Sequence, residues 1–405
     1  MSLQFITGGS GAGKSEYLSR LVCEESVRRP HDNFIVVVPE QYTMETQKKL
    51  VHMHSRKGIL NIDVVSFERL AYKVFEELGG GNRPVLDDTG KNLIVRRVLE
   101  KEKKKLDYFG SSIEKTGFVS ELKSVISELL QYGITPQQLG EIGENVKEKQ
   151  QLSAKLKDIR LVYKEFMAFL STNYITSEEI LDVLCGLVEK SKLIAGSEII
   201  FDGFTGFTPI QYKLMRLLLV YSKGIKISVT IDKKERPTGH ESWNNLFFMS
   251  KEMMNRLIAI CEEEGINVDD TVCVDRDINY RYEGAKDLAY LERNLFRYKG
   301  GVYTGTPENI RIYEGSNPKE ELQYIVSEIL QLTRKEGFRY RDIAVVTADL
   351  ETYGKVAANM MKQNDIPAFL DYKRSVAANP YVEMLCSALE IVEKGYPYDT
   401  MFRYL

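Results

Sequence analysis

The sequence predicts an α/β protein in which a parallel sheet is interrupted by a long helical insertion and followed by a second α/β unit. Strand-like and helix-like segments alternate over residues 1–80, which is typical of a parallel sheet with helices on its faces. Residues 87–192 then show only the spacing of apolar side chains found in amphipathic helices. Strand-like runs return at residue 198 and again at residue 310.

The first sheet is predicted from short apolar runs separated by helical segments. The run FIVVV at 34–38 is rich in β-branched residues, as expected for a strand that is buried on both faces. Residues 1–85 and 195–282 are therefore expected to form the two parts of a first domain, with residues 86–194 as the insertion. We expect strands over residues 3–7, 34–38, 62–66, 198–201 and 226–230, and helices over residues 14–26, 44–52, 67–78, 210–221 and 244–264.

The second α/β unit is predicted to begin after a linker at residues 283–304, which contains an expected helix over 285–296. The chain stops at Leu405 without a polar tail, so we expect this second domain to be incomplete. Residues 305–405 contain strand-like runs at 310–313, 342–346 and 368–370, with helical spacing at 319–335, 352–363 and 381–393.

Composition excludes several classes of protein. The net charge of −3 means that any nucleic acid would bind in a local groove and not on a globally basic surface. The four histidines and five cysteines include no CxxC pair, which argues against a zinc module or a disulfide framework. No apolar run reaches the length of a membrane span and no signal peptide precedes the first strand, so we expect a cytoplasmic protein.

The strongest motif is a glycine-rich segment between the first expected strand and the first expected helix. Glycines let backbone N–H groups curve around phosphate oxygens, and the helix N-terminus adds its positive dipole end. In this motif Lys14 reaches the outer phosphates of ATP, and the Ser15 hydroxyl binds Mg²⁺. The alternatives are a turn without a ligand and a loop that binds nucleotide without using its energy. The segment fits G-x-x-x-x-G-K-[ST] in full: Gly8, Gly9, Ser10, Gly11, Ala12, Gly13, Lys14 and Ser15.

The second candidate ligand for magnesium is Asp202, at the carboxyl end of the expected strand 198–201. An acidic residue in this position meets the water shell of Mg²⁺ in phosphate-loop ATPases. The next residue is Gly203, where motor ATPases commonly carry a glutamate that activates the attacking water. Loss of a positioned general base costs a factor of about 10²–10⁴ in rate. We therefore predict a site that binds Mg–ATP and hydrolyses it slowly, and we assign no catalytic residue.

The ordered set of segments resembles the UvrD-like superfamily 1 helicases. The segment DGFTGFTPIQ at 202–211 is similar to a decayed D-E-F-Q-D-x-x-P-x-Q motif. The segments VPEQ at 38–41, SFERLA at 66–71 and IAVV at 343–346 follow in the order of that family. Within this group, the whole chain is most similar to the AddB family of bacterial helicase–nuclease subunits.

This resemblance implies a phosphate-loop NTPase fold with a RecA-like first domain and the start of a second one. It implies ATP and Mg²⁺ as cofactors and an AddA-type motor subunit as the partner in a heterodimer. It also implies binding to DNA ends and single-stranded DNA, with scanning for a Chi-type signal during double-strand break repair. The deoxyribonuclease and the iron–sulfur cluster of the family are expected beyond Leu405.

Departures from the helicase pattern favour a weak motor. The loop begins at Gly8, which leaves no room for the upstream glutamine that reads adenine in superfamily 1 helicases. Ala348 stands where the γ-phosphate arginine of the family is expected, and DKKE at 232–235 replaces a glutamine-containing motif. The alternatives are a self-sufficient superfamily 1 helicase, a nucleotide-regulated scaffold without DNA binding, and a small-molecule kinase.

Three residues are candidates for contact with DNA. By the resemblance, Ser66 would bind a phosphate and Phe67 would stack on a base at the end of the third expected strand. The alternative for this pair is a helix-capping serine followed by a core phenylalanine. Trp243 is the only tryptophan and lies in a polar segment, where it would stack on a base or, more commonly, pack in the protein or an interface.

Overall fold

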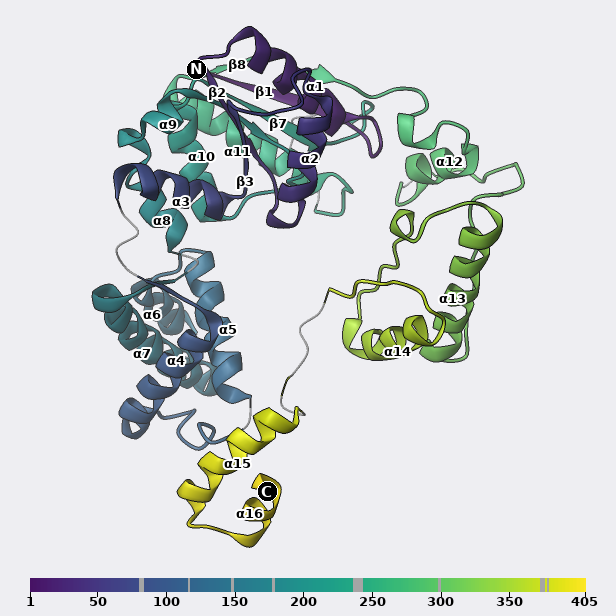
Figure 1. The fold of residues 1–405 in the computed structure, drawn as a ribbon. Helices are drawn as coiled ribbons and strands as arrows, with labels where there is room; N and C mark the ends of the chain where they lie inside the picture. The colour runs from purple at the N-terminus through teal and green to yellow at the C-terminus, as the bar shows by residue number, and fades with distance from the viewer. Residues whose placement is uncertain are drawn as a thin grey trace. The chain divides into compact units, whose positions relative to one another are not determined.

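The computed structural model describes the chain except for residues 80–83, 116, 147–148, 177–178, 236–242, 298–299, 372–375 and 377–378 (Figure 1). The described residues form two compact units, Met1–Asn309 and Ile310–Leu405.

The first unit is built on a parallel sheet, which confirms the predicted fold class. In the described part of the chain the sheet has seven strands. Six of them are in the order β3-β2-β6-β7-β1-β8, and β9 pairs with β1 nearer to its carboxyl end than β8 does. The strands that precede the insertion in the sequence and those that follow it therefore lie in one sheet, with β6 directly beside β2. They are β1 (Ser2–Gly8), β2 (Asn33–Val37), β3 (Ile62–Val65), β6 (Ser197–Phe201), β7 (Gly224–Thr230), β8 (Asn267–Val268) and β9 (Val272–Cys273).

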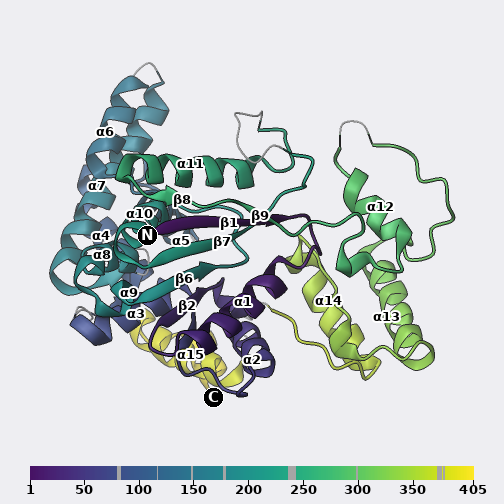
Figure 2. The same ribbon diagram turned by 90° about the horizontal axis from the view of Figure 1, so that it is seen from above.

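Helices cover both faces of the sheet because alternate strand residues point to opposite sides. Leu3 and Phe5 pack in one core with α3, α8, α10 and α11, whereas Ile6 packs in another core with α1 and α2. Figure 2 shows α11 on one side of the strands and α1 and α2 on the other. Besides the helices of the insertion, the described part of this unit contains α1 (Lys14–Arg28), α2 (Thr43–Met53), α3 (Phe67–Leu78), α8 (Ile180–Cys185), α9 (Lys192–Ala195), α10 (Pro209–Tyr221), α11 (Phe248–Glu264) and α12 (Lys286–Asn294). Helix α8 and most of α9 fall within residues 86–194, where the insertion was expected, but Ile180, Leu184 and Ile194 pack in the core of the sheet, so the insertion ends before α8.

The insertion has its own apolar core, formed by α4 (Asp88–Glu102), α5 (Phe118–Gln131), α6 (Pro136–Asn145) and α7 (Gln150–Asn173). Its helical character matches the expectation for residues 87–192. One detail was wrong, because residues 175–176 form a strand. This strand, β5 (Ile175–Thr176), pairs in parallel with β4 (Val85–Leu86) where the insertion begins and ends. Two-residue strands show no periodicity in sequence, and only the tertiary contact reveals them.

The second unit contains α13 (Pro318–Lys335), α14 (Leu350–Gln363), α15 (Pro380–Lys394) and α16 (Tyr398–Tyr404). Its helices agree with the sequence, but its predicted strands do not. Residues 310–313, 342–346 and 368–370 are described and none of them is paired into a sheet. β-branched residues favour an extended backbone, but a parallel strand also needs a neighbour that satisfies its N–H and C=O groups.

Glu198 on β6 binds two cations, Arg29 at the end of α1 and Lys226 on the neighbouring strand β7. Its side chain is 10% exposed, accepts a hydrogen bond from Arg29 Nη2 at 2.5 Å, and also bonds the ammonium of Lys226. Burial opposes the ionisation of Glu198, but the hydrogen bonds from Lys226 and Arg29 outweigh it and lower its pKa. The carboxylate is therefore the stabilising form of this residue in the folded chain.

Glu198→Gln is expected to lower the free energy of unfolding by about 1–2 kcal/mol at pH 7, since it leaves two partly buried cations without their anion. Because the pKa of Glu198 is lower in the folded chain than in the unfolded chain, its carboxylate contributes its full stabilisation at pH values above the unfolded pKa. This contribution is lost as the pH falls through the folded pKa. The difference between wild type and variant in urea unfolding should therefore shrink below about pH 4.5. Asp63→Asn is the control, because Asp63 forms an exposed ion pair with Lys73. A difference that stays constant down to about pH 3.5 would contradict this.

No helix in the described parts of the chain has the length and apolar character needed to cross a bilayer.

Candidate functional site

The glycine-rich loop lies where the sequence places it, between the end of β1 at Gly8 and the start of α1 at Lys14. Gly11 and Gly13 have φ values of 70° and 94°, in the left-handed region that favours glycine. The Ala12 N–H donates to the Gly9 carbonyl at 3.3 Å, which closes the loop on itself. The sequence pattern is thus matched by the tight curve that a phosphate-binding loop needs.

Lys14 folds back over the beginning of this loop. Its Nζ donates to the carbonyl oxygens of Gly8 and Gly9, each at 2.9 Å. Burial lowers the pKa of Lys14, and the nearby carboxylate of Asp202 opposes this shift. The ammonium therefore lies at the first residues of the loop, and its surroundings contain both signs of charge.

Asp202 is brought to the same edge of the sheet. It follows β6 directly, only β7 separates β6 from β1, and the carboxyl ends of parallel strands meet at one edge. Ser228 Oγ donates to Asp202 Oδ1 at 2.6 Å, which fixes the carboxylate. Two candidates that lie far apart in sequence, Lys14 and Asp202, thus act on each other electrostatically.

The metal site implied by the motif rests on few protein atoms. Among the described residues, no group of three or more His, Cys, Asp or Glu side chains gathers as a metal site. Mg²⁺ does not require one, because it keeps several waters and commonly takes one or two protein oxygens plus phosphate. The Ser15 hydroxyl at the start of α1 and the Asp202 carboxylate supply the oxygen donors that fit this chemistry.

Gly203 has a backbone that restricts substitution. Its φ is 83°, and a Cβ built there would lie 3.4 Å from Cδ of Pro39. Gly203 stands where motor ATPases commonly carry a glutamate, so a glutamate introduced here would be the direct way to supply the missing base. The left-handed conformation makes that substitution unfavourable, because side-chain-bearing residues are strained there.

Gly203→Glu is accordingly expected to lower the free energy of unfolding by about 1–2 kcal/mol and to leave ATP turnover unimproved. Thermal unfolding and single-turnover hydrolysis measure the two effects. Gly58→Glu is the matched control, since the nearest atom to its Cβ position is 3.9 Å away and its φ is not positive. Equal stability of the two variants together with faster hydrolysis in Gly203→Glu would refute the expectation.

Residues 275–282, which we call the strap, lie across the glycine-rich loop. The Arg281 N–H donates to the Gly11 carbonyl at 3.3 Å, and Asn279 Nδ2 donates to the Ser10 carbonyl at 3.2 Å. A Cβ on Gly11 would lie 2.5 Å from Arg281 Cβ, so only glycine allows this approach. The strap follows β9, a strand beside β1, and therefore leaves the sheet at the same edge as the loop.

Arg281 is the functional candidate that sequence reasoning missed. Together with burial, its charge lowers the pKa of Lys14, so its guanidinium acts on the lysine of the loop. The expectation of a weak motor rested in part on Ala348, which stands at the place of the family's γ-phosphate arginine, and did not consider an arginine from the strap. The available signal was an arginine between two tyrosines, at 280–282, shortly after the short apolar run VCV at 272–274.

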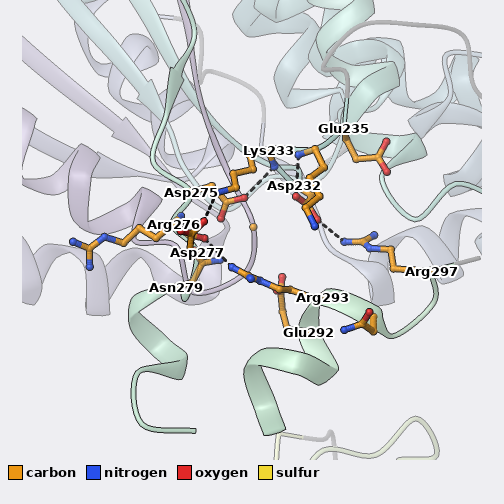
Figure 3. A pocket seen from close by; sticks show the side chains of 13 residues that line it. Asp232, Lys233, Glu235, Asp275, Arg276, Asp277, Asn279, Glu292, Arg293 and Arg297 are labelled. Carbon is orange, nitrogen blue, oxygen red and sulfur yellow. Dashed lines mark hydrogen bonds and ion pairs between the residues drawn. The ribbon is translucent and has the colours of Figure 1, made fainter. Parts of the chain in front are cut away.

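A charged cavity of 360 Å³ opens beside Gly9 (Figure 3). Lys233 N donates to Asp275 Oδ2 at 3.0 Å, and Arg297 pairs with Asp232 at 3.3 Å. Glu292 and Arg293 both extend from α12 into the cavity (Figure 3). Burial, with smaller contributions from Asp275 and Asp232, raises the pKa of Glu292, and the nearby Ser10 backbone opposes this shift.

The proposed DNA residues occupy different environments. Ser66 is buried and caps α3, where its side chain accepts the Arg69 N–H at 3.3 Å. Phe67 is buried against Phe201, at 5.7 Å between ring centroids, and against two further phenylalanines. Both therefore take the alternative roles of cap and core, and a DNA contact by either stays a prediction. Trp243 is 80% exposed and so does not pack within the chain, whereas its packing in an interface and its stacking on a base both stay predictions.

Comparison with known proteins places the chain in a family. The family model described as ADDB, N-terminal, matches residues 5–292. Proteins named as subunits of an ATP-dependent helicase/deoxyribonuclease match the full length of this chain. The one from Lachnoclostridium phytofermentans is 42% identical, and those from Caldanaerobacter subterraneus subsp. tengcongensis and Clostridioides difficile are each 36% identical. The chain covers 36% of the first relative and 35% of the other two. It therefore belongs to the AddB family, and it corresponds to the N-terminal region of that family.

Proposed function

We propose that this region binds Mg–ATP at the glycine-rich loop and serves as the helicase-like part of a heterodimeric helicase–deoxyribonuclease. The observation that carries the proposal is the convergence of Lys14, Asp202 and Arg281 on one loop from three different strand ends. Cations and backbone N–H groups compensate the charge of phosphates, and Ser15 and Asp202 would hold Mg²⁺. The names of the relatives, which include ATP dependence, support the choice of nucleotide.

Tyr280 is a candidate for the base of the nucleotide. Its ring lies beside the loop, with Cδ2 3.3 Å from the position of a Gly13 Cβ, and 55% of the residue is exposed. The guanidinium of Arg276 lies 3.9 Å from the ring centroid and holds the ring from one side. An exposed ring fixed in this way offers a face on which a base would stack. Such stacking would hold the base in the absence of the upstream glutamine, but it would form no base-specific hydrogen bonds.

Hydrolysis in this proposal is slow because the site lacks a general base at Gly203. Arg281 would supply charge compensation for the outer phosphate, so the missing base alone limits the rate. The test is single-turnover hydrolysis of radiolabelled ATP by the purified chain, with and without single-stranded DNA. Rapid turnover that DNA stimulates would support the alternative of a self-sufficient superfamily 1 helicase.

The chain spans about one third of the length of these relatives, so the activity that their names describe comes to it as a proposal. We propose an AddA-type motor as partner, DNA ends as substrate, and scanning of single-stranded DNA for a Chi-type signal during recombination repair. The deoxyribonuclease centre and an iron–sulfur cluster would belong to other parts of the protein. The support is that this chain matches, from end to end, part of relatives named as helicase/deoxyribonuclease subunits.

Trp243 is our candidate for contact with single-stranded DNA. Its side chain is exposed and lies in the segment between β7 and α11, which begins at the carboxyl end of β7. Base–aromatic stacking contributes about 1–3 kcal/mol per base, so Trp243→Ala is expected to weaken binding to a single-stranded oligonucleotide about tenfold. Fluorescence anisotropy at two salt concentrations measures it.

The control for this experiment is Tyr132→Ala, which removes an exposed aromatic side chain from the helical insertion. Equal affinities of the two variants would contradict a role for Trp243. If the unmodified chain shows no salt-dependent affinity for DNA at all, the alternative of a nucleotide-regulated scaffold is favoured.

A further inference from the structure

Glu292 of α12 reaches the glycine-rich loop from outside the motif. Its Oε1 lies 3.2 Å from the position that a Cβ on Gly9 would occupy. Asn279 Nδ2, which donates to the Ser10 carbonyl at 3.2 Å, lies equally close to that position. The carboxylate of Glu292 therefore lies beside the backbone that a phosphate-binding loop offers to its ligand.

The position of Glu292 corresponds to the outer end of a bound phosphate chain. Lys14 reaches the β- and γ-phosphates in loops of this kind, and its Nζ lies at the carbonyls of Gly8 and Gly9. The inner phosphate binds nearer to the helix N-terminus at Ser15. A third phosphate would therefore extend toward Gly9 and Ser10, where the carboxylate of Glu292 lies.

The charges around Glu292 make its position easy to disturb. Among the described residues it forms no ion pair, and Asp275 and Asp232 lie near enough to act on its carboxylate. Glu292 lines both the charged cavity and a second, more apolar cavity of 560 Å³ that includes Ser10 and Tyr282. The side chain thus has space on both sides into which it can turn.

We propose that Glu292 sets the preference of this site between nucleoside diphosphates and triphosphates. Its carboxylate contacts the loop beside Gly9, where a terminal phosphate would extend. A diphosphate leaves this contact intact, whereas a triphosphate displaces the carboxylate and with it the adjoining turn of α12. The preference rests on the proposed nucleotide site and adds to it a residue that the phosphate-loop motif does not contain.

Glu292→Gln tests the proposal because it keeps the shape of the side chain and removes its negative charge. Calorimetric titration of the 405-residue chain with Mg–ADP and with the Mg complex of a non-hydrolysable imido analogue of ATP gives two dissociation constants. We expect the variant to bind the triphosphate analogue about tenfold more tightly and ADP with unchanged affinity, as removal of one like-charge contact predicts. Glu263→Gln, which changes an exposed glutamate of α11, should alter neither constant.

Hydrogen exchange supplies a second measurement that a merely structural role of Glu292 would not change. The triphosphate analogue, but not ADP, should speed amide exchange in α12 of the unmodified chain. Equal changes in the two dissociation constants, or exchange that is the same with both nucleotides, would overturn the proposal while leaving the nucleotide site in place. If neither nucleotide binds the folded wild type or the variant, the proposed function itself is wrong and the preference falls with it.

Discussion

Lys14→Ala is expected to weaken the binding of Mg–ATP about 100-fold, which corresponds to the loss of a charge-assisted contact of about 2.7 kcal/mol. Lys14 is the only cation within the motif, and its Nζ already lies at the carbonyls of Gly8 and Gly9, at the outer end of the loop. Arg281 remains in the variant and would retain part of the charge compensation, so binding should be weakened and not abolished. Calorimetry with the imido analogue of ATP measures the change.

Folding should be little affected by this substitution, because the loop closes through backbone contacts such as Ala12 N–H to the Gly9 carbonyl. Lys73→Ala is the matched control. Lys73 forms an exposed ion pair with Asp63 in the same domain, on α3 and β3, and its loss should leave nucleotide affinity unchanged. If Lys14→Ala leaves the affinity for Mg–ATP unchanged, the nucleotide does not bind at this loop. The double variant with Arg281→Ala then shows whether the two cations act on one ligand.

The parts of the fold that sequence predicts well have a local physical cause. The strand of residues 34–38 is visible because five apolar residues in succession, rich in β-branched side chains, are typical of a strand covered on both faces, and β2 indeed lies between β3 and β6. The loop before α1 is visible because glycines at 11 and 13 are needed for positive φ. Such features are determined by a few neighbouring residues.

The missed features depend on partners that are distant in the chain. β8 and β9 have two residues each, too short for a period, and exist only because β1 offers them hydrogen bonds. The pairing of β9 with β1 also brings Arg281 to Gly11, although the two residues are separated by most of the sequence of the first unit. No local pattern therefore identifies Arg281. Ser66 and Phe67 are ambiguous for a different reason. The same two residues fit both a family motif for DNA contact and a helix cap followed by a core phenylalanine, so the sequence alone does not distinguish the two roles.

Asp158→Ala is expected to lower the stability of the helical insertion by about 3–5 kcal/mol. Asp158 on α7 is 1% exposed, and its carboxylate accepts three backbone N–H groups: those of Asp107 at 3.1 Å, Tyr108 at 2.8 Å and Phe109 at 2.9 Å. Alanine would leave three donors near the core without an acceptor, at a cost of about 1–3 kcal/mol for each donor that stays away from water. Asp158→Asn keeps one acceptor oxygen and should lose about half as much.

Hydrogen exchange in α4 to α7 separates this effect from the sheet domain, since the insertion has a core of its own. Asp107→Ala is the control, because Asp107 pairs with Lys157 at 2.7 Å in an exposed ion pair that should contribute less than about 1 kcal/mol. Exchange in the sheet and affinity for nucleotide should stay unchanged in all three variants, since every contact of Asp158 named here lies within the insertion. If Asp158→Ala exchanges no faster than Asp107→Ala, the three backbone donors have found other acceptors, and the carboxylate does not hold residues 107–109 in place.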